Sequence, residues 1–336
     1  MDNKIIKFIL SAAGLLFILY SCIGIGCEKD YSAHQVSQPQ GLARKLSQSE
    51  IFLTKNENDK TSVHITSLDR EVSSTITLCH EGDGAELSPD GKFLVFEYGE
   101  MVEGEDRSGF WIRDLSTGEE RKVFVWPEES SKTFISSPSF SPDSEHILFS
   151  ISWLDREIVG LGTVQLDGSN LQVLDADGSL NRAPIYSPDG KSILVICGGR
   201  DKDSGQPGFQ LCIMNSDGSK RKIITEDGDS HGSYHFTPDS KEIIYTESEF
   251  GGILGIINRP YYRINAMDKD GSNKMTILDW NKPLGILEIS KDGGEIIFFE
   301  HDGYPTRIFI INRDGSKLRH LAYFDQFLDE WFPENE

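Results

Sequence analysis

The chain has 336 residues, with 54 acidic and 33 basic side chains and a formal net charge of −21 at pH 7. This excess of negative charge argues against DNA or RNA as a partner, because nucleic-acid phosphates are bound by clustered lysine and arginine. Hydrophobic residues make up 38% of the chain and glycine contributes 32 residues, as in an ordinary globular protein. The length suits two domains or one large all-β unit, so internal repeats decide the architecture.

The amino terminus has the composition of an export signal. Lys4 and Lys7 precede an uncharged, mostly apolar stretch over residues 8–26. A basic segment followed by an apolar one is typical of secretory signals, so we expect the rest of the chain to lie outside the cytoplasm. The alternatives are simple secretion and an uncleaved helix, because about 20 apolar residues are enough to span a bilayer.

Cys22 ends a segment that resembles a bacterial lipoprotein signal. Leu19 stands three residues before this cysteine and Ser21 directly before it, with the less usual Tyr20 between them. We therefore predict a signal peptide of lipoprotein type over residues 1–21 and lipid attachment at Cys22. The acyl chains would hold the protein on the periplasmic or outer side of a membrane.

Cys27 is a second candidate for lipid attachment, although Gly24 stands where an aliphatic residue is expected. Residues 22–41 are predicted to form the anchor and a polar, flexible tether. At the other end of the chain, residues 326–336 are predicted to form an acidic tail. The globular part is therefore expected between them, over residues 42–325.

A four-residue sequence built around an aspartate recurs five times. Its copies are Ser88-Pro89-Asp90-Gly91, Ser141-Pro142-Asp143-Ser144, Ser187-Pro188-Asp189-Gly190, Thr237-Pro238-Asp239-Ser240 and Ser290-Lys291-Asp292-Gly293. Proline sets φ for a turn, aspartate accepts hydrogen bonds from nearby backbone N–H groups, and glycine or serine ends the turn. Because a strand-like run follows each copy, we predict that it joins two antiparallel strands. The aspartates with this structural role are Asp90, Asp143, Asp189, Asp239 and Asp292.

A second sequence, Asp-Gly-Ser in most copies, follows farther along each repeat. Its copies are residues 114–118, 167–169, 217–219, 270–272 and 314–316. Apolar runs flank it, so we predict that it joins a third strand to a fourth. Four strands recurring every 40–50 residues are typical of β-propeller blades. Residues 42–78 contain three further apolar runs without the first turn sequence, which makes them a degenerate first blade and gives six blades in all.

These paired turns resemble the repeat of TolB-like, WD-type β-propellers of the bacterial envelope, over roughly residues 42–325. The resemblance implies an all-β, six-bladed propeller of four-stranded antiparallel blades, here preceded by the export signal. The pattern departs from the family in the first blade and at Lys291, which replaces proline. The family's founding member has a helical domain where this chain has only a tether, so the resemblance does not extend to that member's partner. The architecture hosts binding proteins, peptidase domains and lyases, and therefore implies fold more strongly than function.

Three insertions stand between the predicted strands. Residues 99–109 are acidic, residues 198–208 are flexible, and residues 249–262 are apolar and aromatic. The third is the best candidate for a partner loop, because its large apolar side chains are costly to expose unless something covers them. The candidate contact residues are Ile253, Leu254, Ile256, Ile257, Tyr261 and Tyr262. The alternative is that this loop folds over its own blade.

His231 and His235 are four residues apart, so on a strand both side chains would point to one face. The resemblance includes metal-dependent lyases of pectin fragments, in which histidines hold a divalent ion in the propeller channel. His231 and His235 are therefore candidate metal ligands, with His301 as the helper that such a site would need. Ordinary polar lining of the channel is the reading that we favour, with no metal and no cofactor.

No catalytic residue is predicted. Residues 228–232 match G-x-S-x-G, but a nucleophile elbow requires a helix after the serine, and here the sequence continues into a propeller turn. Cys197 and Cys212 stand on adjacent strands of one predicted hairpin. A disulfide between them is compatible with an oxidising compartment, but we expect two small buried hydrophobic residues.

The sequence thus predicts a non-catalytic, membrane-anchored binding module of the bacterial cell envelope. It would recognise a protein or a glycan at the propeller face. One alternative is a metal-dependent polysaccharide lyase of the oligogalacturonate type, which would need three or more converging ligands. The other is a structural subunit of an envelope complex.

Overall fold

The structure, a computed structural model, describes most of the chain between Ile51 and Tyr323. The described residues are 51–57, 60–66, 73–78, 83–102, 105–126, 133–153, 158–175, 181–200, 207–225, 232–249, 261–300 and 306–323. The regular structure within these ranges is all β-strand. None of them forms a helix long and apolar enough to cross a membrane. The predicted signal peptide, the tether and the acidic tail lie outside the described residues.

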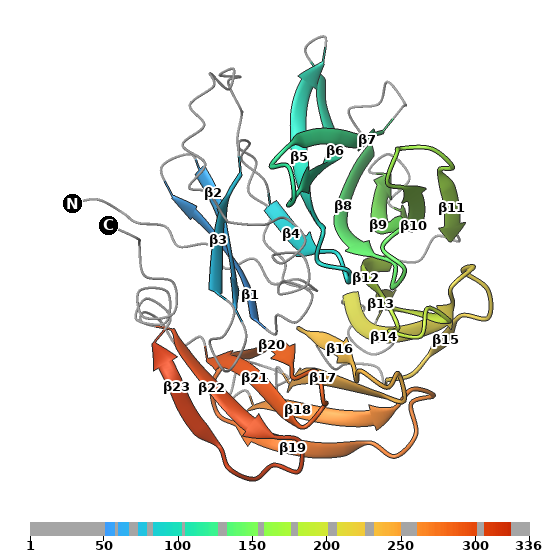
Figure 1. Ribbon diagram of the computed structural model, residues 1–336. Helices are drawn as coiled ribbons and strands as arrows, with labels where there is room; N and C mark the ends of the chain where they lie inside the picture. The colour runs from blue at the N-terminus through green and yellow to red at the C-terminus, as the bar shows by residue number, and fades with distance from the viewer. Residues whose placement is uncertain are drawn as a thin grey trace, which may run out of the picture. The chain divides into compact units, whose positions relative to one another are not determined.

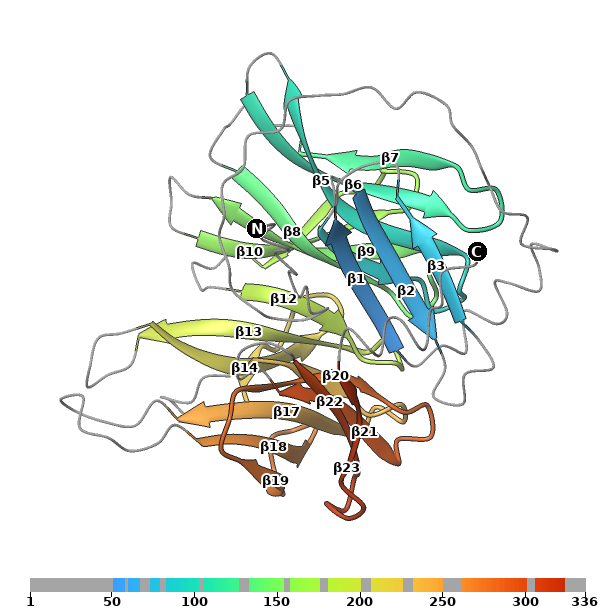
Figure 2. The ribbon, with the colours of Figure 1, turned by 90° about the vertical axis from the view of Figure 1, so that its left-hand side faces the viewer.

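The strands form antiparallel sheets, one of three strands and five of four (Figure 1). The first three sheets comprise β1 (Ile51–Glu57), β2 (Lys60–Thr66) and β3 (Ser73–Thr77); β4 (Asp83–Leu87), β5 (Phe93–Val102), β6 (Glu105–Asp114) and β7 (Glu120–Val125); and β8 (Thr133–Phe140), β9 (His146–Trp153), β10 (Ile158–Gln165) and β11 (Gln172–Asp175). The other three comprise β12 (Asn181–Tyr186), β13 (Ser192–Arg200), β14 (Pro207–Asn215) and β15 (Lys222–Ile223); β16 (Tyr234–Phe236), β17 (Glu242–Glu249), β18 (Tyr261–Asp268) and β19 (Met275–Trp280); and β20 (Leu284–Ile289), β21 (Glu295–Glu300), β22 (Arg307–Asn312) and β23 (Arg319–Tyr323). The prediction of an all-β chain built from four-stranded antiparallel sheets is confirmed. The three-stranded sheet, with its strands side by side in Figure 2, falls in the degenerate first repeat.

The chain divides into two compact units, with the boundary between Gly178 and Ser179. The sheets β1–β3, β4–β7 and β8–β11 belong to the first unit, and the remaining three sheets belong to the second. Within every sheet, strands that follow one another along the chain also pair with one another.

This simple order separates the two ends of each four-stranded sheet. The Ser-Pro-Asp-Gly type of turn joins the first strand to the second, and the Asp-Gly-Ser type joins the third to the fourth. Because neighbouring strands run in opposite directions, both turns lie at one end, which we call the turn end. The connection between the second and third strands lies at the opposite end, which we call the loop end.

The second strand β17 is buried on both faces, because it packs between the sheet before it and the sheet after it. On β17, Ile243 and Tyr245 belong to a cluster with Leu194 of β13. The residue between them, Ile244, belongs to a different cluster with Phe298 of β21. Alternate residues of a strand point to opposite faces, so one strand contributes to two interfaces. Complete burial of such a side chain contributes roughly 1.5–3 kcal/mol.

Glycine in the Asp-Gly-Ser turns allows successive sheets to approach closely. Gly168 and Gly271 have φ angles of 82° and 88°, in the left-handed region. A Cβ atom on Gly168 would lie 2.2 Å from the carbonyl oxygen of Val123, and one on Gly271 would lie 2.9 Å from that of Ile224. Val123 is on β7 and Ile224 directly follows β15, and these are the last strands of the preceding sheets. Each turn therefore packs directly against the backbone of the preceding sheet.

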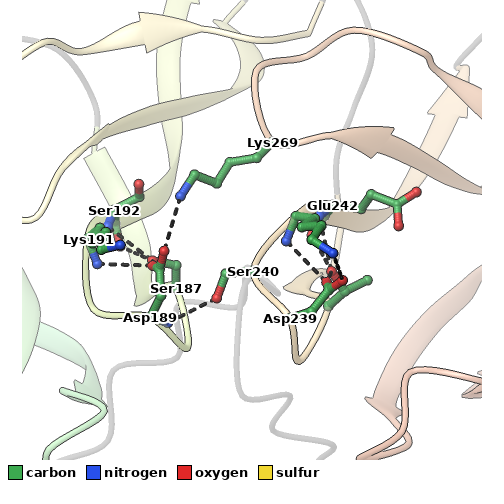
Figure 3. Close-up of polar contacts among 10 residues, drawn as sticks. Ser187, Asp189, Lys191, Ser192, Asp239, Ser240, Glu242 and Lys269 are labelled. Atoms are coloured by element: carbon green, nitrogen blue, oxygen red, sulfur yellow. Dashed lines mark hydrogen bonds and ion pairs between the residues drawn. The ribbon is translucent and has the colours of Figure 1, made fainter.

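The Ser-Pro-Asp-Gly turn is held by a hydrogen bond between two side chains (Figure 3). The Ser187 hydroxyl donates to Asp189 Oδ1 at 2.6 Å and accepts from the backbone N–H of Ser192 at 3.0 Å. Asp189 Oδ1 also accepts from the Lys191 N–H at 3.1 Å. The same hydroxyl-to-carboxylate bond occurs in the turns of Asp90, Asp143, Asp239 and Asp292, at 2.7, 2.5, 2.7 and 2.6 Å.

Serine at the last position of a turn links it to the turn before. Ser240 Oγ accepts from the Asp189 N–H at 2.9 Å (Figure 3), and Ser144 Oγ accepts from the Asp90 N–H at 3.2 Å. Ser144 and Ser240 have φ angles of 62° and 60°, a region that costs a residue with a Cβ free energy. The bond to the neighbouring turn offsets that cost. It accounts for serine where three other copies have glycine.

Two expectations are corrected by the structure. Cys197 on β13 and Cys212 on β14 form a disulfide with their Cα atoms 5.7 Å apart, instead of two separate buried thiols. Cys197 faces Gln210 across the strand pair, so the bridge runs diagonally between the strands, where register brings the sulfurs together. The acidic insertion at 99–109 is also not a loop, because β5 and β6 pair through it as far as Val102 and Glu105.

Replacement of Ser240 tests the link between turns. Ser240→Ala should lower the free energy of unfolding by about 1–2 kcal/mol, because it removes the bond to Asp189 and keeps a Cβ at positive φ. Ser240→Gly loses the same bond but relieves the backbone, so its loss should be smaller by about 1 kcal/mol. Urea unfolding of both variants measures the difference, and equal losses would contradict the account.

Candidate functional site

His235, the candidate metal ligand, is the middle residue of β16 and faces Ile244 of β17. The residue as a whole is half-buried, but its Nε2 atom is fully buried and has no hydrogen-bond partner among the described residues. Burial lowers the pKa of His235 to about 4, against a smaller opposing effect from a hydrogen bond to the Ile286 backbone. The imidazole is therefore neutral at pH 7, the form in which histidine binds metals.

His235 belongs to no group of three candidate metal ligands in the part of the chain that the structure describes. His231 and His301 lie outside the described residues. One group of three candidate ligands occurs within them, namely Asp143, Glu145 and His146, whose ligand atoms lie within 4.8 Å of one another. This group is on the turn between β8 and β9, largely exposed, and it does not include His235.

The first strands of the second unit are fixed by side-chain hydrogen bonds between sheets. The buried Ser233 hydroxyl accepts from the Ile286 N–H at 3.0 Å, and the Tyr234 hydroxyl donates to the carbonyl of Ala183. Both contacts meet bulged stretches of β20 and β12, where ladder hydrogen bonds are interrupted. Gly232, which ends the G-x-S-x-G match, leads through Ser233 into β16, so no helix follows it.

In the first unit, acidic side chains form the corresponding hydrogen bonds between sheets. Glu86 accepts from the Phe140 N–H at 3.0 Å and Glu97 from the Ser137 N–H at 2.6 Å. The Ser137 N–H lies within the bulge of β8, and the Phe140 N–H lies just after it. In β8, β12 and β20, backbone groups at or beside the bulges are therefore satisfied by side chains of a neighbouring sheet.

The turn aspartates are occupied by contacts within the turns. Hydrogen bonds from a serine or threonine hydroxyl are the main cause that lowers the pKa of Asp143, Asp189, Asp239 and Asp292. For Asp90, burial is the largest effect and raises the pKa, but hydrogen bonds from Lys92 and Ser88 outweigh it and the pKa is lowered. These carboxylates are ionised at neutral pH and bonded locally.

The predicted partner loop is described only at its end. Tyr261 and Tyr262 open β18, and Tyr262 faces Ser248 of β17. Tyr262 is half-buried, and this burial raises the pKa of its hydroxyl. The candidate residues Ile253, Leu254, Ile256 and Ile257 lie outside the described residues, as does the predicted lipid-attachment residue Cys22.

Sequence reasoning missed two buried carboxylates in the second unit. Glu300, the last residue of β21, accepts hydrogen bonds from Trp280 Nε1 at 2.8 Å, Lys282 Nζ at 3.2 Å and Arg307 Nε at 3.1 Å. Burial alone would raise the pKa of Glu300, but the bonds from Arg307, Trp280 and Lys282 reverse the shift and lower it. Only 3% of its surface is exposed.

Glu247 on β17 is the second, with 4% of its surface exposed. It accepts from Asn265 Nδ2 at 2.5 Å and pairs with Lys274 Nζ at 2.6 Å. Arg263 lies directly across the strand pair, with its guanidinium 3.9 Å from Glu247 Oε1. A glutamate eight residues after a turn aspartate and opposite an arginine in the predicted hairpin is a signal that would have found both sites.

No protein-family model matches this chain, and no curated protein sequence matches it. Several solved structures, however, match the structure of this chain. TolB from Acinetobacter baumannii aligns with a TM-score of 0.60 at 17% identity, over 82% of this chain and 64% of that protein. The chain therefore spans less than two thirds of TolB's length.

Two further structures have the same fold. An oligogalacturonate lyase in complex with manganese aligns with a TM-score of 0.60 at 16% identity, over 84% of this chain and 76% of the lyase. A chain of a nidogen/laminin complex aligns with a TM-score of 0.54 at 13% identity, over 83% of this chain and 94% of that one. The fold is thus that of a β-propeller similar to the propeller of TolB. At these identities the similarity concerns the fold alone.

Lowering the pH should destabilise the protein over a pH range that is set by the shifted pKa of His235. A histidine that stays neutral to about pH 4 when folded but takes up a proton near pH 6.5 when unfolded favours unfolding as the pH falls between these values. We expect a loss of up to roughly 3 kcal/mol between pH 7 and pH 4 from this residue. Urea unfolding of His235→Asn should show a smaller loss, whereas the exposed control His320→Gln should behave like the unchanged protein. The same slope in His235→Asn would refute the assignment.

Proposed function

We propose that this protein is a non-catalytic binding module of the bacterial cell envelope. In this proposal it is exported, lipid-anchored through Cys22 and tethered by residues 22–41. Residues 42–325 form one six-bladed propeller, which recognises a protein or a glycan at the loop end of its sheets. Residues 326–336 form an acidic tail.

The observation that carries the proposal is that the two ends of each four-stranded sheet differ: one end has the repeated turns, and the other has connections of variable sequence. The repeated carboxylates at the turn end are engaged in turns, as Asp189 is with Ser187 at 2.6 Å. The loop end carries the connections that differ most in sequence, including the apolar residues 249–262. Variable connections on a rigid scaffold are the usual location of binding residues.

Two further observations support the proposal. The Cys197–Cys212 disulfide suits an oxidising compartment outside the cytoplasm. Structures with the same fold include TolB and a chain of a nidogen/laminin complex. The fold therefore occurs in a protein assembly, which favours a binding role for the present chain.

A metal-dependent lyase is the second candidate, favoured by the fold of the manganese-bound oligogalacturonate lyase and by the buried Nε2 atom of His235. A single neutral imidazole does not hold a catalytic divalent ion, which needs several protein ligands. His235 belongs to no group of three candidate ligands among the described residues, and His231 and His301 lie outside them. We therefore derive no reaction step through a metal.

Membrane anchoring is tested by substitution of the two candidate cysteines. Cys22→Ser should move the protein from the membrane fraction to the soluble fraction, because the lipid is lost and acyl chains provide the anchoring. Cys27→Ser is the matched control and should remain with the membrane. Cell fractionation followed by immunoblotting gives the result. Release by Cys27→Ser, with Cys22→Ser retained, would reassign the lipid.

Binding is tested with the full-length protein crosslinked in intact cells and captured from solubilised membranes. One partner should be enriched with the unchanged protein and reduced at least about tenfold by the paired change Ile253→Asp and Ile256→Asp, because charge in an apolar contact is costly. Ser219→Ala, in an exposed turn-end contact, is the control. Turnover of an acidic oligosaccharide that is abolished by a chelator or by His235→Ala would overturn the non-catalytic assignment.

A further inference from the structure

The fourth strands of the second unit carry most of the large hydrophobic side chains that the structure exposes. These strands, β15, β19 and β23, each form one edge of their sheet (Figure 1). Five large hydrophobic side chains are exposed among the described residues. Four of them lie on these strands or directly before one, namely Ile223, Met275, Leu318 and Tyr323. Exposed apolar groups that gather in one region commonly mark a contact surface.

Three of these apolar residues directly follow an exposed lysine. The pairs are Lys222 with Ile223, Lys274 with Met275, and Lys317 with Leu318. Lysine on an edge strand commonly prevents pairing with another chain. That role needs charge alone. It does not explain large apolar side chains exposed beside the charge, because these favour association.

The same region is positively charged in a chain that is strongly negative. In the second unit, the stretches that follow the aspartates of the Asp-Gly-Ser turns are residues 218–225, 271–278 and 315–323, which we call the basic edge. They contain six lysine or arginine side chains and no acidic one. The corresponding residues of the first unit, 118–125 and 168–175, contain two basic and three acidic side chains. Positive charge at this position is therefore not a requirement of the repeat.

Contacts between sheets join the three stretches of the basic edge. Lys222 Nζ donates at 2.7 Å to the carbonyl of Asp270, in the turn that precedes β19. The turn that precedes β23 is equally close to β19, because a Cβ atom on Gly315 would lie 2.8 Å from the carbonyl oxygen of Ile277. Each turn thus packs against the fourth strand before it. The basic edge is therefore continuous along the turn end of the second unit.

Local contacts leave positive charge on this edge. The ammonium of Lys222 is bonded to a neutral carbonyl, which does not cancel its charge. Arg319 pairs with Glu295 at 3.7 Å, but both groups are exposed and such pairs are weak. Lys274 differs, because it pairs at 2.6 Å with the buried carboxylate of Glu247. Its stretch therefore contributes mainly an apolar side chain, and the other two contribute charge as well.

We propose that the basic edge is the surface with which the second unit contacts an anionic phospholipid bilayer. Lysine and arginine attract the headgroup phosphates. The exposed apolar side chains enter the boundary between headgroups and acyl chains, where tyrosine is also favoured. The combination of the two kinds of side chain fits a lipid surface better than it fits a soluble anion, which would be recognised by charge alone.

The inference rests on the membrane anchoring in the proposed function and adds how the protein faces the bilayer. A flexible tether over residues 22–41 would span about 25 Å, which keeps the edge within reach of the membrane. The net charge of −21 is repelled by an anionic bilayer. A local positive surface therefore determines which side of the second unit faces the lipid. Contact at the turn end leaves the loop end accessible to a partner.

The test is hydrogen–deuterium exchange of the full-length protein on two kinds of vesicle. One is phosphatidylcholine alone, and the other is an equal mixture of phosphatidylcholine and phosphatidylglycerol. The anchor attaches the protein to both, but the anionic vesicles should slow exchange in the basic edge roughly fivefold relative to the neutral ones, because the bilayer excludes water. Salt at about 0.5 M should remove the difference, because it screens the charges. Equal exchange on both kinds of vesicle at low salt would overturn the proposal.

Charge reversal on the edge gives a second measurement. Lys220→Glu with Lys317→Glu should abolish the difference between the vesicles, since both lysines are exposed and lie in the two most basic stretches. The matched control is Lys122→Glu with Lys191→Glu, which makes the same change in net charge outside the basic edge and should retain the difference. A difference that persists in the first variant, or that is lost in both, would contradict the proposal.

Flotation with the vesicles is scored separately and distinguishes the edge from the anchor. Flotation with anionic but not with neutral vesicles would refute the anchor and support the edge. Flotation with both, without a difference in exchange, would refute the edge alone, and flotation with neither would refute both. Exchange that is slowed by soluble polyglutamate but not by anionic vesicles would assign the edge to an acidic polymer and overturn the lipid assignment.

Discussion

The hydrogen bond from a buried hydroxyl to the turn aspartate is the interaction on which the rest of the fold depends. The hydroxyl of Ser187 donates to the Asp189 carboxylate and also accepts from the backbone N–H of Ser192, so one side chain joins both ends of the turn. Because the bond recurs in five turns, it sets the register of the first and second strands in every four-stranded sheet. Register then decides which side chains face each interface, since a shift of one residue reverses the faces.

The fold was largely predictable because its signals are local. Serine, proline, aspartate and glycine specify a turn within four residues, and the apolar runs that follow specify the strands beside it. Gly168 illustrates the limit of this reasoning. Its positive φ follows from the turn sequence, but its close approach to Val123 depends on the neighbouring sheet and has no sequence signal of its own.

The candidate site was less predictable, because it depends on the exact register of paired strands and on contacts between neighbouring sheets. Cys197 and Cys212 could be assigned to one hairpin, but their bonding follows from a diagonal register that the sequence does not specify. Glu247 and Glu300 look like ordinary surface residues until the strands are paired. Ser240 looks like a replacement for glycine until its hydroxyl is seen to bind the preceding turn. In each case the missing information is the strand register or the sheet packing that brings the two partners together.

The disulfide has one more consequence, for the covalent integrity of the chain. Cys197 and Cys212 stand on either side of residues 201–206, which connect β13 to β14. A peptide bond cut anywhere in that connection would leave two fragments joined through sulfur, with the paired strands still held in register. A protease in an oxidising compartment would therefore create new termini in this protein without separating its parts, and the cut would become visible only on a reducing gel.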